Sequence, residues 1–254
     1  MLHFRHLIIA CVFILATPVF AADGRVELVE HLGEKIPLSL EFIDSHGRTV
    51  RLEELIDRPT LMVPVFYNCR NVCNLLLGSL SQVLPDIKLT PGKDYNVVTF
   101  SFDPLETTDM AAHSKQTFMT AMQNPSYPAD AWRFLIGTQQ NILQLTDAAG
   151  YYFKKEKDDF LHPLAIFVVA KDCTIVRYLI GQRFASIDLS MALLEASEGR
   201  IGSPIKTALQ FCFSYDPEGR RYVFNMLRVS GSVILLTLGS FLLFLILSGR
   251  KKKK

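Results

Sequence analysis

Residues 229–247 carry no charged side chain and form an almost entirely apolar run, about the length that a helix needs to cross a bilayer. This run predicts a transmembrane helix. The tail at residues 248–254 follows it directly and ends in four lysines. Basic clusters beside a membrane span tend to stay on the cytoplasmic side. We therefore expect a protein anchored in the cytoplasmic membrane by a single C-terminal span, with its globular part on the opposite side.

The N-terminal end has the pattern of a secretory signal peptide. Arg5 precedes an apolar run at residues 7–20, and the small residues Ala21 and Ala22 follow. This pattern predicts a signal peptide at residues 1–22. An uncleaved N-terminal anchor is the alternative, although the run is short for a full membrane span. Both interpretations place the body of the protein on the periplasmic or extracytoplasmic side.

The chain between these segments is expected to form one domain at residues 30–200, joined to the span by a membrane-proximal segment at 201–228. Residues 30–200 contain no Ser/Gly-rich linker and no internal repeat. The formal net charge of the chain is only +2, and four of its lysines lie in the tail. The folded part is therefore not strongly basic, and we expect no nucleic-acid partner.

Strand-like and helix-like patterns alternate along this domain. The pattern predicts strands at residues 60–67, 95–102, 132–136, 164–170 and 175–180, helices at 73–84, 108–122, 138–149 and 186–197, and an N-terminal β-hairpin at 38–52. Strands separated by helices favour a mixed sheet with helices on both faces. A thioredoxin-like α/β fold has this order of elements.

Two cysteines, Cys69 and Cys73, follow the apolar strand at 60–67 and open the next helix. This spacing places both sulfurs on one helix face, close enough for a disulfide or for a shared metal ion. A helix N-terminus favours thiolates, which are reactive and bind metals. A structural disulfide is the alternative, but such bridges more often join distant segments. The position of the pair therefore favours a functional site.

His162 is the third candidate, because it lies just before the apolar strand at 164–170. In a thioredoxin-like layout the start of that strand lies beside the cysteine loop, so the imidazole can approach both sulfurs. Two thiolates and one imidazole suit Cu(I) and also accommodate Cu(II). Zinc would prefer a fourth ligand, and an iron–sulfur cluster would need more cysteines. A histidine with only surface or hydrogen-bonding roles is the alternative.

Several blocks of the chain resemble the Sco/SenC family in sequence and in order. They are VFYNCRNVC at 65–73, VVTFSFDP at 97–104, WRFLIG at 132–137 and the segment around His162. The resemblance covers roughly residues 35–195. EASEGRIGSP at 195–204 and YDP at 215–217 look like a C-terminally anchored bacterial subgroup. The resemblance implies a thioredoxin-like fold that binds copper through Cys69, Cys73 and His162.

The same resemblance implies a copper metallochaperone and not an enzyme. Its partner would be the copper-bearing subunit of cytochrome c oxidase, whose binuclear copper centre it would help to assemble, with a thioredoxin-like reductant and another copper carrier as further partners. The alternative is a thiol–disulfide oxidoreductase, in which Cys69 and Cys73 reduce the oxidase subunit or another exported protein. A peroxide-reducing enzyme is a third hypothesis, but its usual threonine and cysteine arrangement is missing around Cys69.

Two residues depart from many relatives in this family. Arg70 stands where proline is common, and Pro163 stands where a small hydroxyl residue is common. The positive charge of Arg70 is expected to lower the pKa of the neighbouring thiols and to strengthen reducing chemistry. The balance between copper carrier and thiol reductant therefore stays open at the level of sequence.

Asp103 precedes Pro104 at the carboxyl end of a predicted strand, so it is expected at the same sheet edge as the cysteines. It would steer a partner, support the cysteine loop or serve only as a turn residue. The two remaining cysteines of the domain and its membrane-proximal segment, Cys173 and Cys212, receive no role, because nothing in the sequence favours a bridge between them.

Overall fold

The computed structural model describes residues 26–69, 72–157, 159–202, 213–216, 221–224, 234 and 237–241. The predicted signal peptide and basic tail lie outside these residues, as does most of the predicted span at 229–247. Within that span, residues 234 and 237–241 are helical. In the described part of the chain, no helix is both long and apolar enough to cross a membrane.

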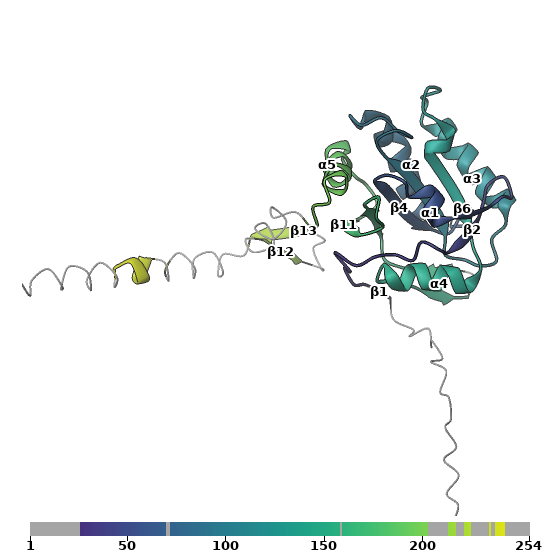
Figure 1. The fold of residues 1–254 in the computed structure, drawn as a ribbon. Coiled ribbons are helices and arrows are strands. Elements are labelled where there is room, and N and C mark those ends of the chain that lie inside the picture. Colours follow the sequence, from purple (N-terminus) through teal and green to yellow (C-terminus); the bar gives the residue numbers. More distant parts are fainter. Residues whose placement is uncertain are drawn as a thin grey trace, which may run out of the picture.

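The domain is built around a mixed β-sheet (Figure 1). In the described residues its strands lie in the order β11-β10-β4-β5-β6-β2-β3. Strands β4, β5 and β6 run parallel, and the other neighbouring pairs are antiparallel. The strands are β2 (Glu41–Asp44), β3 (Thr49–Arg51), β4 (Thr60–Val65), β5 (Asn96–Ser101), β6 (Trp132–Ile136), β10 (Ala165–Val169) and β11 (Ile175–Ile180).

Helices cover both faces of this sheet, as the sequence predicts. Helix α2 (Val72–Val83) connects β4 to β5, and α3 (Thr108–Ala121) connects β5 to β6. The parallel strands β4, β5 and β6 follow one another across the sheet, and right-handed crossovers between such strands place the connecting helices α2 and α3 on the same face. Helix α4 (Gln139–Ala148) lies on the opposite face (Figure 1). Helix α5 (Ser186–Ser197) packs on β10 and β11.

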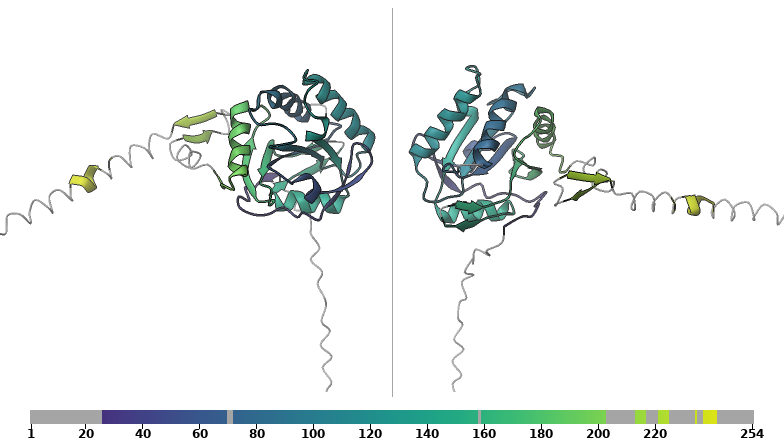
Figure 2. Two further views of the ribbon diagram at one scale, coloured as in Figure 1. Left: turned by 45° about the horizontal axis from the view of Figure 1, so that its top comes forward. Right: turned by 180° about the vertical axis from the view of Figure 1, so that it is seen from behind.

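Short elements complete the described structure. They are β1 (Glu27–Leu28) paired with β7 (Tyr151–Tyr152), β8 (Lys154–Glu156) paired with β9 (Asp159–Leu161), β12 (Phe213–Asp216) paired with β13 (Arg221–Phe224), the helix α1 (Leu52–Leu55), and the 3-10 turns η1 (Leu84–Asp86) and η2 (Ala129–Ala131). The two views of Figure 2 show the β12–β13 pair outside the central sheet.

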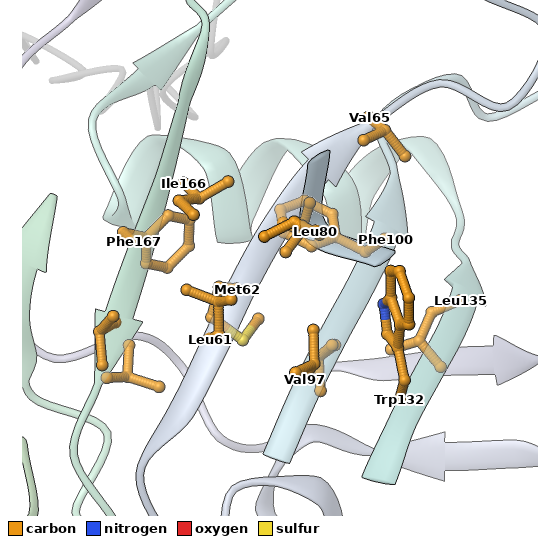
Figure 3. Packing of buried hydrophobic residues seen from close by; sticks show 14 of the residues in the cluster. Leu61, Met62, Val65, Leu80, Val97, Phe100, Trp132, Leu135, Ile166 and Phe167 are labelled. Carbon is orange, nitrogen blue, oxygen red and sulfur yellow. The ribbon is translucent and has the colours of Figure 1, made fainter. Parts of the chain in front are cut away.

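The core lies on both faces of the central strands, where apolar side chains are packed closely (Figure 3). Every residue of β4 is buried, which agrees with its nearly continuous apolar sequence. Figure 3 shows Leu61 of β4, Val97 of β5 and Trp132 of β6 in this packing. The indole N–H of Trp132 donates a hydrogen bond of 2.8 Å to the Thr99 hydroxyl, so this polar group is buried with a partner.

The ends of the helices follow from local sequence signals. Thr107 caps α3 by accepting a hydrogen bond from the Met110 N–H, and Thr138 caps α4 in the same way. Gly150 ends the α4 region with a φ of +59°, which glycine adopts readily. Helix α2 ends at Val83, one residue before the predicted end, and Pro85 lies in the 3-10 turn η1 that follows.

A candidate dithiol and metal site

The two cysteines meet at the carboxyl edge of β4. Cys69 lies in the loop after this strand, and Cys73 lies in the first turn of α2. Their exposed fractions are 5% and 2%. The Cys69 carbonyl accepts a hydrogen bond of 2.7 Å from the side-chain amide of Asn74, which fixes the loop to the helix. The side chains of Cys69 and Cys73 are themselves hydrogen-bonded to each other.

His162 reaches the same place from a distant part of the chain. It follows β9 and precedes β10, and β10 pairs antiparallel with β4. The residues before β10 therefore lie beside the residues after β4, where the cysteines are. The Nε2 atom of His162 is 3.7 Å from the Sγ atom of Cys73. The structure thus brings together a thiol pair and an imidazole that are far apart in sequence.

A tyrosine on the second side of the imidazole fixes which nitrogen carries the proton. The Tyr151 hydroxyl donates a hydrogen bond of 2.7 Å to the Pro163 carbonyl. The Nδ1 atom of His162 lies 2.9 Å from both the Tyr151 oxygen and the Pro163 carbonyl oxygen. A nitrogen that faces two acceptor oxygens is favoured as the N–H donor. The Nε2 lone pair therefore points toward Cys73, as a metal ligand would require.

Aromatic rings shield this side of the site. The ring of Phe102 lies 5.1 Å from that of His162, measured between centroids. Phe153 and Phe160 lie 4.8 Å and 5.4 Å from Phe102, and Phe66 lies 5.2 Å from Phe160. The rings therefore pack against the imidazole and help to hold it beside Cys73.

The pKa of the Cys73 thiol differs from the sequence-based expectation. Its hydrogen bond with Cys69 raises this pKa most, burial raises it further, and the nearby Glu106 carboxylate acts in the same direction. The helix N-terminus and Arg70 predict a lowered thiol pKa instead. This prediction is wrong for Cys73, because burial and the neighbouring sulfur outweigh the helix N-terminus. Arg70 itself lies outside the described residues.

Two residues that the sequence does not single out support the site. Tyr151 orients His162, as described above. Glu106 is buried and accepts hydrogen bonds from the backbone N–H groups of Tyr67 and Asn68, at 2.8 Å and 2.7 Å. Its position three residues after Asp103, at the same sheet edge, is the only sequence signal for it. Asp103 serves a turn, because its carboxylate accepts a hydrogen bond of 3.0 Å from the Leu105 N–H.

The described residues contain no group of three or more His, Cys, Asp or Glu side chains close enough together to hold a metal ion. Each cysteine contacts the other, and His162 contacts Cys73, but the three do not form a closed ligand cage. Cys173 is buried in the turn between β10 and β11, at the opposite end of these strands, and Cys212 lies outside the described residues. Cys173 therefore does not join the site.

The fold and the site together define a class of protein. It is a mixed α/β domain, consistent with a thioredoxin-like fold, that carries a CxxxC dithiol at a strand-to-helix junction with a distant histidine against it. The SCO1/SenC family model matches residues 30–194, and the chain belongs to this family. The resemblance noted in the sequence is confirmed.

Several solved structures are similar to this chain. A candidate electron transfer protein from Aquifex aeolicus VF5 is 28% identical, with a TM-score of 0.60 over 66% of this chain and 95% of that chain. Copper-bound ScoI from Arabidopsis thaliana is 18% identical, with a TM-score of 0.53 over 66% and 99% of the two chains. BsSco, described as a cytochrome c oxidase assembly protein with a disulfide switch, is 21% identical, with a TM-score of 0.51 over 68% and 98%. The last two show likeness of fold. No curated protein matched the chain.

Proposed function

We propose that this protein carries copper for the assembly of cytochrome c oxidase, and that Cys69, Cys73 and His162 bind the metal. The observation that carries the proposal is the approach of His162 Nε2 to Cys73 Sγ at 3.7 Å. With metal–ligand bonds of about 2.3 Å for sulfur and about 2.0 Å for nitrogen, two ligands of one ion lie roughly 3.5–3.8 Å apart. The observed separation fits two atoms that share a metal ion.

The chemistry of the donor set supports copper. Two sulfurs and one neutral imidazole are soft or borderline ligands, which suit Cu(I) and tolerate Cu(II). A thiol with a raised pKa gives up its proton when a metal ion takes its place, so binding one ion would release protons from Cys69 and Cys73. Relatives in the family support the same cargo, since one of the similar structures holds copper.

Transfer to a partner would be a ligand exchange and not a redox step. Thiolates of the copper-bearing oxidase subunit would replace Cys69, Cys73 and His162 one at a time around Cu(I), and protons would return to the released thiols. The oxidation state of the metal would not change. The description of BsSco as an oxidase assembly protein supports this choice of partner. A thioredoxin-like reductant and a second copper carrier would reduce and load the site.

The second candidate function is thiol–disulfide exchange with the oxidase subunit. The hydrogen bond between Cys69 and Cys73 favours it, because the two sulfurs are close enough to react. Oxidation of the pair to a disulfide would transfer two electrons and two protons to a target disulfide. The raised pKa of Cys73 makes Cys69 the better candidate for the attacking thiol in such an exchange, since only the thiolate attacks.

Copper stoichiometry in the full-length, reduced protein tests the proposal. We expect one copper ion per chain in the wild type and loss of tight binding in Cys69→Ser and Cys73→Ser. Cys173→Ser is the matched control, because this buried thiol lies at the opposite end of the strands. Unchanged stoichiometry in both site variants would contradict the assignment of the ligands.

A further inference from the structure

Glu106 is a buried carboxylate in the loop that follows β5, and its side chain faces the cysteine loop. Its exposed fraction is 6%. Oε1 accepts a hydrogen bond of 2.7 Å from the Asn68 N–H. Oε2 accepts one of 2.8 Å from the Tyr67 N–H and one of 2.5 Å from the Ser101 hydroxyl. Three donors thus converge on one buried acidic group.

This arrangement acts on the two residues directly before Cys69. Tyr67 and Asn68 connect β4 to Cys69, and both of their N–H groups are held by the same carboxylate. On the other side, the Asn74 side chain holds the Cys69 carbonyl. The backbone around Cys69 is therefore tied to the β5 loop before the cysteine and to α2 after it. Hydrogen bonds to a charged acceptor are stronger than those between neutral groups.

The candidate ligand Cys69 lies in a loop, whereas Cys73 lies in a helix. Cys73 gains its position from α2, and His162 gains its position from Tyr151 and the Pro163 carbonyl. Cys69 has no regular element of its own, so its place depends on these loop contacts. Burying a carboxylate is costly unless all of its hydrogen bonds are made. The need to hold Cys69 in a fixed position explains why a buried carboxylate is present at Glu106.

We propose that Glu106 is a positioning residue that sets the place of Cys69 relative to Cys73 and His162. The proposal rests on the copper function given above. Glu106 holds Cys69 in place through the Tyr67 and Asn68 amides, and its charge also acts on Cys73. Its effect should therefore appear in the properties of the dithiol and of bound copper, beyond any change in stability.

The test uses Glu106→Gln in the full-length protein. Glutamine has the same shape, but its amide nitrogen is a donor, so one of the two backbone N–H groups would face another donor. We expect Cu(I) affinity to fall about 10- to 100-fold, as for other groups that orient metal ligands. The amide NMR signals of Tyr67 and Asn68 should shift in the metal-free protein, which reports directly on these hydrogen bonds.

Glu195→Gln is the matched control. Glu195 is also a buried carboxylate, with an exposed fraction of 7%. Its Oε2 atom lies 3.0 Å from a guanidinium nitrogen of Arg177, and this ion pair does not include the cysteines. Its loss should lower stability and leave Cu(I) affinity unchanged. Equal affinity losses in both variants, or none in Glu106→Gln, would overturn the proposal.

The metal-free dithiol separates this proposal from the copper function. If the wild type binds no copper, the copper function fails, and the midpoint potential of the Cys69/Cys73 couple decides the role of Glu106. We expect at least a tenfold change in the dithiol–disulfide equilibrium in Glu106→Gln, about 30 mV, and none in Glu195→Gln. An unchanged midpoint potential in Glu106→Gln would overturn the positioning role of Glu106. If Glu106→Gln does not fold, Ser101→Ala removes one of the three donors, keeps the carboxylate charge, and should also change this potential.

Discussion

At the residue scale, two groups hold the candidate ligands of the site in place. Tyr151 fixes the His162 ring, and Glu106 fixes the backbone before Cys69. The three candidate ligands could be predicted from their residue types and positions in the sequence. Tyr151 and Glu106 could not, because their roles arise from contacts between segments far apart along the chain.

Replacing Tyr151 with phenylalanine tests the first of these contacts. The Tyr151→Phe protein loses the hydroxyl near His162 Nδ1 and keeps the buried ring. We expect Cu(II) affinity to fall about tenfold, because groups that orient a ligating histidine have effects of this order. Stability should fall by about 1 kcal/mol, the usual value for one hydrogen bond. Metal titration and denaturant unfolding measure the two effects.

Tyr178→Phe provides the comparison for this variant. The Tyr178 hydroxyl donates a hydrogen bond of 2.8 Å to the Ala149 carbonyl and accepts one of 3.3 Å from the His31 N–H, and neither bond involves the cysteines or His162. It should cost similar stability and leave copper affinity unchanged. If Tyr151→Phe binds Cu(II) as tightly as the wild type does, Tyr151 does not orient His162 for metal binding.

At the element scale, the main strands and helices agree well with the sequence prediction. The bounds of β6, β11 and α5 match it, because each has a clear apolar pattern and a marked end. The short strands β1, β7, β8 and β9 were not predicted. They exist only through pairing with other segments, as in the register of Glu27 with Tyr152, and they are too short to show a period.

Gly150 offers a test of how one of these short pairings is kept. Its φ is +59°, and a Cβ atom placed on it would lie 2.0 Å from the Val29 carbonyl oxygen. Gly150→Ala should therefore break the approach of the β1 region to the end of α4 and cost at least about 2 kcal/mol. Equilibrium unfolding of the full chain measures this loss.

Gly47→Ala is the control for backbone strain alone. Gly47 has a φ of +77°, and a Cβ atom placed on it would have no atom within 4 Å. This substitution should cost only about 1 kcal/mol. Equal losses of stability in the two variants would show that the close approach at Gly150 is unimportant.

At the scale of the whole molecule, the placement in the membrane is still a prediction from sequence. The predicted signal peptide and most of the predicted span lie outside the described residues. We expect the globular domain outside the cytoplasm and residues 251–254 inside it. Protease added to intact spheroplasts should digest the domain and leave a cytoplasmic marker protein intact. If the domain resists the protease in intact spheroplasts and is digested only after they are lysed, this topology is ruled out.

The family and the central sheet could be predicted because they rest on long apolar segments and on the spacing of the cysteines. The convergence of Cys73 and His162 could be predicted from the order of strands, since both lie at one edge of the sheet. The balance between copper transport and thiol exchange could not. It depends on the pKa of buried thiols and on hydrogen bonds that only the folded chain brings together.

The most direct test of the copper assignment is a comparison of two activities in His162→Ala. Cytochrome c oxidase copper loading and the rate of dithiol exchange would be measured in cells and in the purified full-length protein, beside the wild type. A copper carrier needs all three ligands, whereas thiol exchange needs only Cys69 and Cys73. We expect loading to be lost and exchange to be preserved. Normal copper loading in His162→Ala would contradict the assignment of His162 as a copper ligand.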